Sequence, residues 1–206
     1  MTQIMTATEM TDGQIENAVN KLRDAMRKHR SEITSGVAQQ VLGVENLGMM
    51  MFTPFRECAE VVSNIIIRKV KVNRSRSPEA TLVATTRVQY TDRKVVDAMP
   101  KGEGDEAEVV FFKLNLSKRN GCISDDDLEK EFELRELKPA DPISVAAVNE
   151  ADHGFADKHP NGTHWKNADG KWCFATFSRL GGARRVNVDC GGGGWCDDWW
   201  FAGLRK

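Results

Sequence analysis

The chain has 206 residues, of which 40% are hydrophobic and 29% are charged, and its formal net charge is −1. This composition is typical of a soluble globular protein with one core, or with one domain and a smaller helper, and it excludes a disordered chain. No segment approaches the roughly 18 consecutive apolar residues of a membrane-spanning helix. The N-terminus shows neither a signal-peptide pattern nor a cysteine placed for a lipid anchor, so we expect a cytoplasmic protein by default, or a component of a larger exported particle.

The charge is unevenly distributed along the chain. Residues 68–94 carry eight basic and two acidic side chains, whereas residues 97–136 carry six basic and twelve acidic ones. Blocks of this kind form surfaces that face each other or face a partner. Two interpretations stay open: solvated hairpins whose charges pair with each other, and a binding surface for a partner.

The first third of the chain predicts helices. Thr11 and Gln14 have the spacing of a capping box, which opens a helix expected over residues 12–30. The apolar residues of its one face are Ile15, Val19, Leu22 and Met26. A second helix is expected over 34–42 and a short third one from Pro54 to Val62. The amphipathic first helix and the Met-rich stretch before Pro54 suggest self-association or attachment to a larger carrier.

Strands are expected next. Residues 64–73 and 80–90 are rich in β-branched side chains, and the polar turn 74–79 between them completes a predicted basic β-hairpin. A nucleic-acid reader would combine such charge with several stacking aromatics, and this stretch has only Tyr90. The polar segment 101–106 predicts a domain boundary. We therefore expect a helical and hairpin support region over 1–104 and a second domain over 105–206.

The second half predicts alternating helices and strands, and the whole chain is expected to be α+β. A strand is expected over 109–116 and a charged helix from Ser124 to about Leu137. Asp141 and Pro142 have the residue types of an N-cap and a first helical position, which indicates a helix over 142–150, with Asp152 capping one more turn. Three further features predict a small antiparallel sheet near the C-terminus: a turn at 167–170, an alternating strand at 185–188, and an aromatic strand at 195–201.

The stretch 173–204 has an unusual composition. Lys, Glu, Gln and Met make up 42 of the 206 residues, and none of them occurs in these 32 positions, where about six are expected. The stretch contains four consecutive glycines, which lose much backbone entropy in an ordered sheet. One hypothesis explains both features. If template codons of the form adenine-adenine-pyrimidine are randomised at their adenines, Gly, Cys, Asp, Ser, Leu and Arg result, but Lys, Glu, Gln, Met and Trp do not.

The C-terminal half also resembles the variable protein of a diversity-generating retroelement. The resemblance covers roughly residues 107–206 and rests on DP at 141–142, VNEAD at 148–152, PNGTHWK at 160–166, DGKWC at 169–173, and the ending W…WWFAGLRK at 195–206. It implies a C-type-lectin-like fold that tolerates side-chain change on one exposed face. In that family a reverse transcriptase copies a template with errors at adenines and writes the copy into the gene. The product binds a changing ligand, often a host-cell or phage receptor, and needs no metal, cofactor or catalysis.

Carried onto this chain, the resemblance implies a set of varied, ligand-binding positions and a set of fixed scaffold residues. The candidate varied residues are Ser178, Leu180, Gly181, Gly182, Arg184, Asn187, Asp189, Cys190, Gly191, Gly193, Gly194, Cys196, Asp197 and Asp198. The scaffold residues are Trp165, Trp172, Trp195, Trp199, Trp200 and Phe201. The hypothesis predicts a hypervariable display protein, and a phage or prophage is its expected source.

Three rival interpretations stay open. The five cysteines are odd in number and contain no CxxC, which argues against a disulfide framework and a standard zinc module. A zinc site would have to combine His153, His159, His164, Cys173, Cys190 and Cys196, whose spacings match no standard module. A hydrolase would have to use Asp189, Asp197 and Asp198, which glycines flank. An intracellular nucleic-acid-associated or inhibitor protein would use the basic stretch 68–94 or the acidic stretch 97–136.

Overall fold

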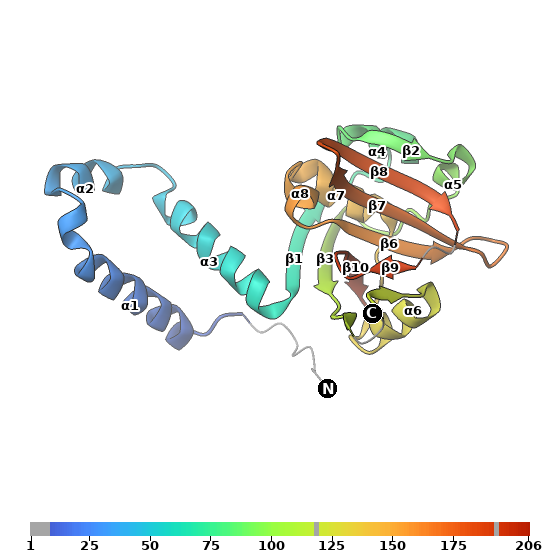
Figure 1. Cartoon of the computed structure of the whole chain (residues 1–206). Helices are drawn as coiled ribbons and strands as arrows, with labels where there is room; N and C mark the ends of the chain where they lie inside the picture. The colour runs from blue at the N-terminus through green and yellow to red at the C-terminus, as the bar shows by residue number, and fades with distance from the viewer. Residues whose placement is uncertain (1–8, 118–119, 192–193) are drawn as a thin grey trace. The chain divides into compact units, whose positions relative to one another are not determined.

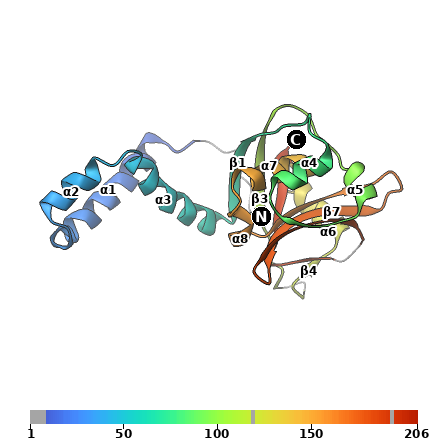
Figure 2. The same cartoon turned by 90° about the horizontal axis from the view of Figure 1, so that it is seen from above.

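A computed structural model of the chain describes residues 9–117, 120–191 and 194–206. The chain forms two compact units, Met1–Val62 and Ser63–Lys206. The first is helical, and the second contains the sheets together with the helices α4 to α8 (Figure 1, Figure 2). The α+β class predicted from the sequence is therefore confirmed.

From residue 9 onward, the helical unit contains the α-helices α1 (Asp12–Lys28), α2 (Ser35–Leu42) and α3 (Leu47–Ser63, whose last residue lies in the second unit). The capping box is present, since the Thr11 side chain accepts from the Gln14 backbone N–H and the Gln14 side chain accepts from that of Thr11. The expectation that Pro54 opens the third helix is wrong, because α3 begins at Leu47 and holds Pro54 inside it. A helix can continue through a proline when it gives up one backbone hydrogen bond.

Among the described residues of this unit, Glu60 is the only buried one. The apolar faces of α1 and α3 line a common groove of about 450 Å³. Its lining residues are Met10, Ile15, Ala18, Val19, Leu22, Met51, Phe52 and Phe55. The apolar face of α1 that the amphipathic pattern predicts is therefore exposed within this unit.

The second unit is built around one mixed sheet with the main order β1-β3-β10-β6-β7-β8-β2, and β5 pairs with β10. Its strands are β1 (Ile65–Lys71), β2 (Val88–Thr91), β3 (Glu106–Lys113), β5 (Leu137–Pro139), β6 (Asn161–Lys166), β7 (Trp172–Leu180), β8 (Ala183–Cys190) and β10 (Trp200–Arg205). The β10–β6 and β2–β8 pairs are parallel and the other pairs are antiparallel. A separate two-stranded ribbon pairs β4 (Cys122–Ile123) with β9 (Trp195–Cys196).

Two hydrophobic cores lie on opposite faces of the sheet. Successive side chains of a strand point to opposite faces of the sheet. In β3 the consecutive residues Val109 and Val110 are both buried, and they belong to different cores. The first core includes residues of α4 (Pro78–Ala84), α5 (Arg93–Asp97), α7 (Pro142–Ala151) and α8 (Phe155–Lys158). The second core includes residues of α6 (Asp125–Glu133), together with Trp195 and Phe201.

The predicted basic hairpin over residues 64–90 does not form. Strand β1 pairs with β3, and the expected second strand is replaced by helix α4 and by β2, which pairs with β8. The Ser77 side chain accepts from the Ala80 backbone N–H, and Pro78 follows at the first helical position. This cap and proline combination favours a helix over the local β propensity.

The expected domain boundary at residue 104 is also wrong. It separates β1 from β3, although these strands pair along seven residues of each. The two charge blocks meet in this pair, where the Lys69 ammonium lies 3.3 Å from the Glu108 carboxylate. The true division follows Val62, where the helical unit ends.

The other predicted elements agree more closely with the structure. Asp141 caps α7, with Pro142 at its first position, and Ser124 caps α6. The turn at 167–170 joins β6 and β7 as predicted. In the part of the chain that the structure describes, no helix is both long enough and apolar enough to cross a bilayer.

Candidate ligand-binding surface

Trp195 is the centre of the frame beneath the candidate surface. Its side chain is buried, and its ring contacts those of Phe174, Trp199 and Phe201 at centroid distances of 6.2, 5.9 and 5.6 Å. A Cβ atom placed on Gly162 would lie 2.9 Å from the Trp195 ring. The glycine in β6 is therefore what lets the indole approach the sheet so closely.

A buried polar network fixes Trp195 to helix α6. The Asp125 carboxylate accepts a hydrogen bond from Trp195 Nε1 at 2.8 Å and contacts Nδ1 of the buried His164 at 2.9 Å. Burial opposes ionisation of Asp125, but the hydrogen bonds from His164 and Trp195 outweigh it and lower the pKa of the carboxyl group. The scaffold residue Trp172 stacks on His164 at 4.4 Å and donates from Nε1 to Asp126.

The remaining predicted scaffold residues also pack into the two cores. Trp200 and Phe201 are buried, whereas Trp165 and Trp199 are partly buried against opposite cores. Each of the tryptophans near the C-terminus therefore has a packing role, as the resemblance implies for fixed positions.

The candidate varied residues fall into two separate groups. The first lies at the end of β8 and along the segment that follows it. Asn187 and Asp189 are exposed on β8 and alternate with the buried Val186 and Val188. A hollow of about 200 Å³ adjoins Asn187. Its lining residues are Asp125, Phe174, Thr176, Asn187, Gly191, Gly194, Trp195 and Trp199.

This first group continues beyond the hollow. Cys196, Asp197 and Asp198 are exposed after Trp195. The last two border a second hollow of about 440 Å³, beside residues 113–116 at the end of β3. We call the first group, Asn187, Asp189, Cys190, Gly191, Gly194, Cys196, Asp197 and Asp198, the β8–β9 surface. Gly193, and its neighbour Gly192, lie outside the described residues.

The second group lies at the β7–β8 turn. Leu180, Gly181 and Gly182 form this turn, which is separated from the Cys173–Cys190 pair by seven residues along each strand. At a strand rise of 3.3 Å per residue, that is about 23 Å. The turn is therefore far from the part of the β8–β9 surface that begins at Asp189, although Asn187 lies only four residues along β8 from Ala183.

Two further members of the second group have partners within the fold. Arg184 forms an ion pair with Asp157 at 2.8 Å, on the side of the sheet that carries α8. Hydrogen bonding from Arg184 lowers the pKa of Asp157, against a smaller effect of burial. Ser178 is half-buried, and its carbonyl oxygen accepts from Arg87 Nη1 at 3.0 Å. Both residues therefore contribute contacts to the frame.

Glycine geometry distinguishes the candidate positions further. Gly181, Gly182 and Gly194 have φ values of +60°, +82° and +66°, a region that other L-residues rarely adopt. Gly191 has no such φ, and an added Cβ would find nothing within 4 Å. Position 191 therefore accepts a side chain freely, whereas the other three favour Gly, Asn or Asp.

Sequence reasoning missed two side chains next to Asn187. Tyr90 of β2 is the register partner of Asn187 and is 51% exposed. The Arg185 guanidinium lies 5.1 Å from the Tyr90 ring centre, in a cation–π geometry. Only the parallel β2–β8 pairing could have revealed them, and a predicted β-hairpin excluded that pairing.

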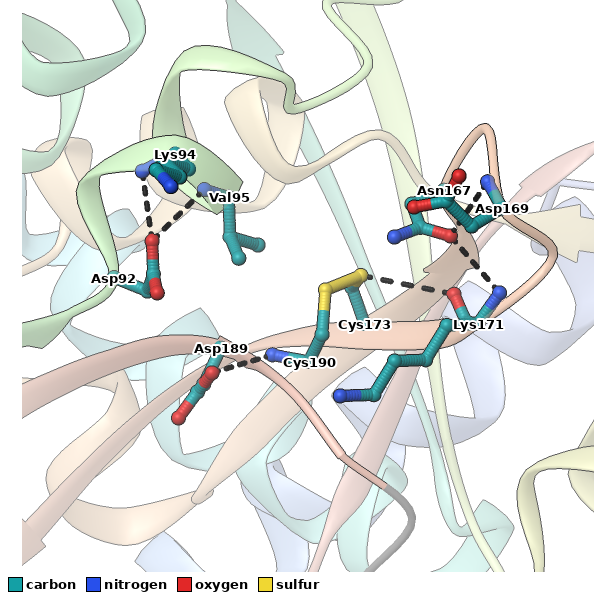
Figure 3. Close-up of a disulfide and its surroundings, with 9 residues drawn as sticks. All are labelled: Asp92, Lys94, Val95, Asn167, Asp169, Lys171, Cys173, Asp189 and Cys190. Carbon is teal, nitrogen blue, oxygen red and sulfur yellow. Dashed lines mark hydrogen bonds between the residues drawn. A yellow bond between two sulfur atoms is a disulfide. The ribbon is translucent and has the colours of Figure 1, made fainter.

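A disulfide bond joins Cys173 to Cys190, as Figure 3 shows. The two residues are register partners on β7 and β8, and the backbone N–H of Cys190 donates to Asp189 Oδ1. The inference that the cysteines form no disulfide framework was therefore wrong for this pair. Their odd number and spacing gave no information about strand register, which is what places them together.

The zinc and hydrolase alternatives depend on where the structure places their candidate residues. Among residues 9–117, 120–191 and 194–206, no three His, Cys, Asp or Glu side chains are grouped so as to hold a metal ion. Asp189, Asp197 and Asp198 are exposed. Nothing therefore encloses these carboxylates in the low-dielectric pocket that general acid–base catalysis favours.

The basic stretch uses much of its charge within the fold. Arg74 lies 2.8 Å from the Asp141 carboxylate, and Arg76 binds both oxygens of Glu150 at 2.7 and 2.8 Å. Burial lowers the pKa of Arg87, whose guanidinium donates to backbone carbonyls. These three arginines stabilise the unit itself and do not form an open phosphate-binding surface.

Comparison with known proteins gave no match: no protein-family model, no curated protein and no solved structure is similar to this chain.

Proposed function

We propose that this chain is a non-catalytic ligand-binding protein whose β8–β9 surface is diversified by a retroelement of the kind its sequence resembles. One observation carries the proposal: residue types that the codon filter allows lie on the β8–β9 surface, whereas the tryptophans, which the filter forbids, are buried or half-buried. Every member of the β8–β9 surface is a type that a randomised adenine-adenine-pyrimidine codon yields. The tryptophans among and after them, Trp195, Trp199 and Trp200, cannot arise from such a codon, and they are buried or half-buried.

This arrangement has the energetics that a diversified surface requires. Substitutions at exposed positions away from special geometry change the free energy of unfolding by only about 0.5 kcal/mol. Asn187 and Asp189 meet that condition, since they are exposed on β8 with a buried core on the opposite face. Gly191 follows β8 and is half-buried, but an added Cβ there would meet nothing within 4 Å. The frame therefore keeps its stability while its surface changes.

The hollows of the surface favour a macromolecular ligand. The hollow beside Asn187, of about 200 Å³, is smaller than the roughly 300–1,000 Å³ of typical small-molecule pockets. The hollow of about 440 Å³ beside Asp197 and Asp198 is within that range, but its lining is mostly polar or charged, whereas small-molecule pockets are mostly apolar. The exposed Tyr90 and the neighbouring Arg185 are of the types that carry most binding energy in protein interfaces. They would supply constant anchor residues beside positions that change.

The disulfide supports a location outside a reducing compartment. Bonds such as Cys173–Cys190 persist in secreted proteins and on virion surfaces and are rare in cytosol. This favours an exported particle, such as a phage, over the default cytoplasmic location. In this proposal the exposed apolar face of the helical unit joins copies of the chain, or attaches it to a carrier, so that weak single sites gain avidity.

A display library tests the proposal. Asn187, Asp189, Gly191, Asp197 and Asp198 are randomised with codons ending in a pyrimidine, the library is displayed on phage, and it is panned against immobilised lysozyme as an arbitrary protein probe. We expect most clones to resist protease as the parent does, and selected clones to bind lysozyme when the parent does not.

A control library randomises the buried residues Val186 and Val188 on the same strand, and its clones are expected to become protease-sensitive. Equal sensitivity in both libraries would contradict the proposal, because the β8–β9 surface would then not tolerate diversification. Strongly salt-dependent DNA binding by the parent protein would instead favour the nucleic-acid alternative.

A further inference from the structure

The β8–β9 surface begins and ends close to a cysteine pair. At one end, the disulfide joins Cys190 to Cys173 on the neighbouring strand. At the other end, Cys196 of β9 is the register partner of Cys122 of β4. In each pair one cysteine is a candidate varied position and the other lies on a strand of the frame.

The second pair has the geometry of two thiols close to reaction. The Cys122 and Cys196 sulfur atoms lie 3.9 Å apart, within hydrogen-bond distance for sulfur. Both residues are exposed, so a small oxidant reaches them without unfolding the protein. Directly opposite residues on adjacent strands have Cβ atoms roughly 4.5–5.5 Å apart, so a small approach of the two strands reaches the roughly 3.5–4.5 Å of a disulfide.

We propose that Cys122 and Cys196 are a second disulfide-forming site, and that a low-molecular-weight disulfide such as oxidised glutathione oxidises it. One cysteine thiolate attacks the glutathione disulfide and releases one glutathione. The other cysteine thiolate then attacks the mixed disulfide and releases the second glutathione. The two cysteines lose two electrons and two protons in total, and one glutathione disulfide is reduced to two glutathione molecules.

The bond would secure a short element. The β4–β9 ribbon has two residue pairs, Cys122 with Cys196 and Ile123 with Trp195, and so short a ladder is weak by itself. With the second bond formed, the chain that begins at Cys190 and ends at Cys196 is fastened covalently to β7 at one end and to β4 at the other. Fastening Cys190 and Cys196, which both belong to the β8–β9 surface, lowers the conformational entropy that these two residues lose when the surface binds a ligand.

The thiols also predict how the reaction depends on pH. The hydrogen bond with Cys122 and then burial raise the pKa of Cys196. Since the thiolate is the attacking species, oxidation of the pair is expected to accelerate as the pH rises toward that pKa. The inference rests on strand register and thiol chemistry alone, so it does not depend on the retroelement proposal.

Peptide mapping of the full chain tests the inference. The protein is reduced, exchanged into oxidised glutathione, alkylated with iodoacetamide and digested. We expect a peptide pair linked through Cys122 and Cys196, about 2 Da lighter than the sum of its two thiol peptides, in addition to the Cys173–Cys190 pair. The exposed Cys58 of α3 is the internal control, and it is expected to be recovered alkylated or as a glutathione adduct.

Recovery of Cys122 and Cys196 only as alkylated or glutathionylated thiols, while Cys173 and Cys190 are linked, would overturn the inference. Hydrogen exchange gives a second readout. The amide of Trp195 is expected to exchange more slowly after oxidation in the parent, and at an unchanged rate in Cys122→Ser and in Cys196→Ser. Slowing of similar size in the two serine variants would also overturn it.

Discussion

Trp195 joins the sheet, helix α6 and the β8–β9 surface through a single side chain. Replacing it with alanine removes its ring contacts with Phe174, Trp199, Phe201 and His164 and leaves the buried Asp125 without one hydrogen bond. We expect Trp195→Ala to lower the free energy of unfolding by about 3–5 kcal/mol in urea denaturation. The matched variant Asp197→Ala, two residues away and exposed, should change it by about 0.5 kcal/mol or less. Similar losses in both variants would show that Trp195 is not the anchor described here.

Asp125 makes the stability of this anchor dependent on pH. Its pKa in the folded protein lies below the ordinary 3.8, so the ionised carboxylate stabilises the fold above that pH. This contribution is lost as the pH falls through the folded-state pKa. Asp125→Asn should therefore be less stable than the parent near neutral pH, and the difference should shrink in acid. Urea denaturation across a pH series measures it, and a difference that stays constant with pH would contradict the assignment.

Two glycines of the candidate set test which positions can vary. An added Cβ meets nothing within 4 Å at either Gly182 or Gly191, but only Gly182 has a positive φ. We expect Gly182→Val to lower the free energy of unfolding by about 1–2 kcal/mol, and Gly191→Val to change it by about 0.5 kcal/mol or less. Gly182→Asn should recover most of the loss, because Asn tolerates the left-handed region. If Gly182→Val and Gly191→Val unfold at the same urea concentration, backbone geometry does not restrict the varied set.

At the scale of elements, local signals predicted structure wherever neighbours in sequence decide it. The capped helices that begin after Thr11 and after Asp141 are examples, as is the turn at 167–170. The same cap signal stands at Ser77-Pro78, where alternating β-branched residues suggested a strand instead. Pairings between distant segments, such as β1 with β3 and β2 with β8, leave no local signal, so the predicted hairpin was wrong.

In the candidate site, too, local sequence signals were informative and pairings between distant segments were not predicted. Residue type and placement along the chain selected the varied positions, and neither contains information about which residues the folded sheet brings together. They could not separate Arg184, which pairs with Asp157 of α8, from Asn187, which is exposed. The Cys173–Cys190 bond and the exposed Tyr90 beside Asn187 depend on strand register, which only the folded sheet supplies.

At the scale of the whole molecule, the helical unit is expected to determine how many copies assemble. Its apolar groove is lined from α1 and α3, and Leu22 is one of the lining residues that remains exposed. We expect sedimentation velocity to show association that increases with concentration for the full chain. Leu22→Glu should abolish it, because a charge on the apolar face must be desolvated, whereas Lys21→Glu on the same helix should not. A full chain that stays monomeric at all concentrations would exclude the assembly role.

The central claim is that the β8–β9 surface is written from a template, and sequencing the DNA that flanks the gene tests it most directly. The account predicts a near-copy of the region encoding residues 173–206 beside a reverse-transcriptase gene. The two copies should differ only at template adenines, with differences at the codons for Asp189 and Gly191 and none at the codon for Trp195. Flanking DNA with neither a near-copy nor a reverse-transcriptase gene, or a near-copy that differs at other bases, would contradict the account.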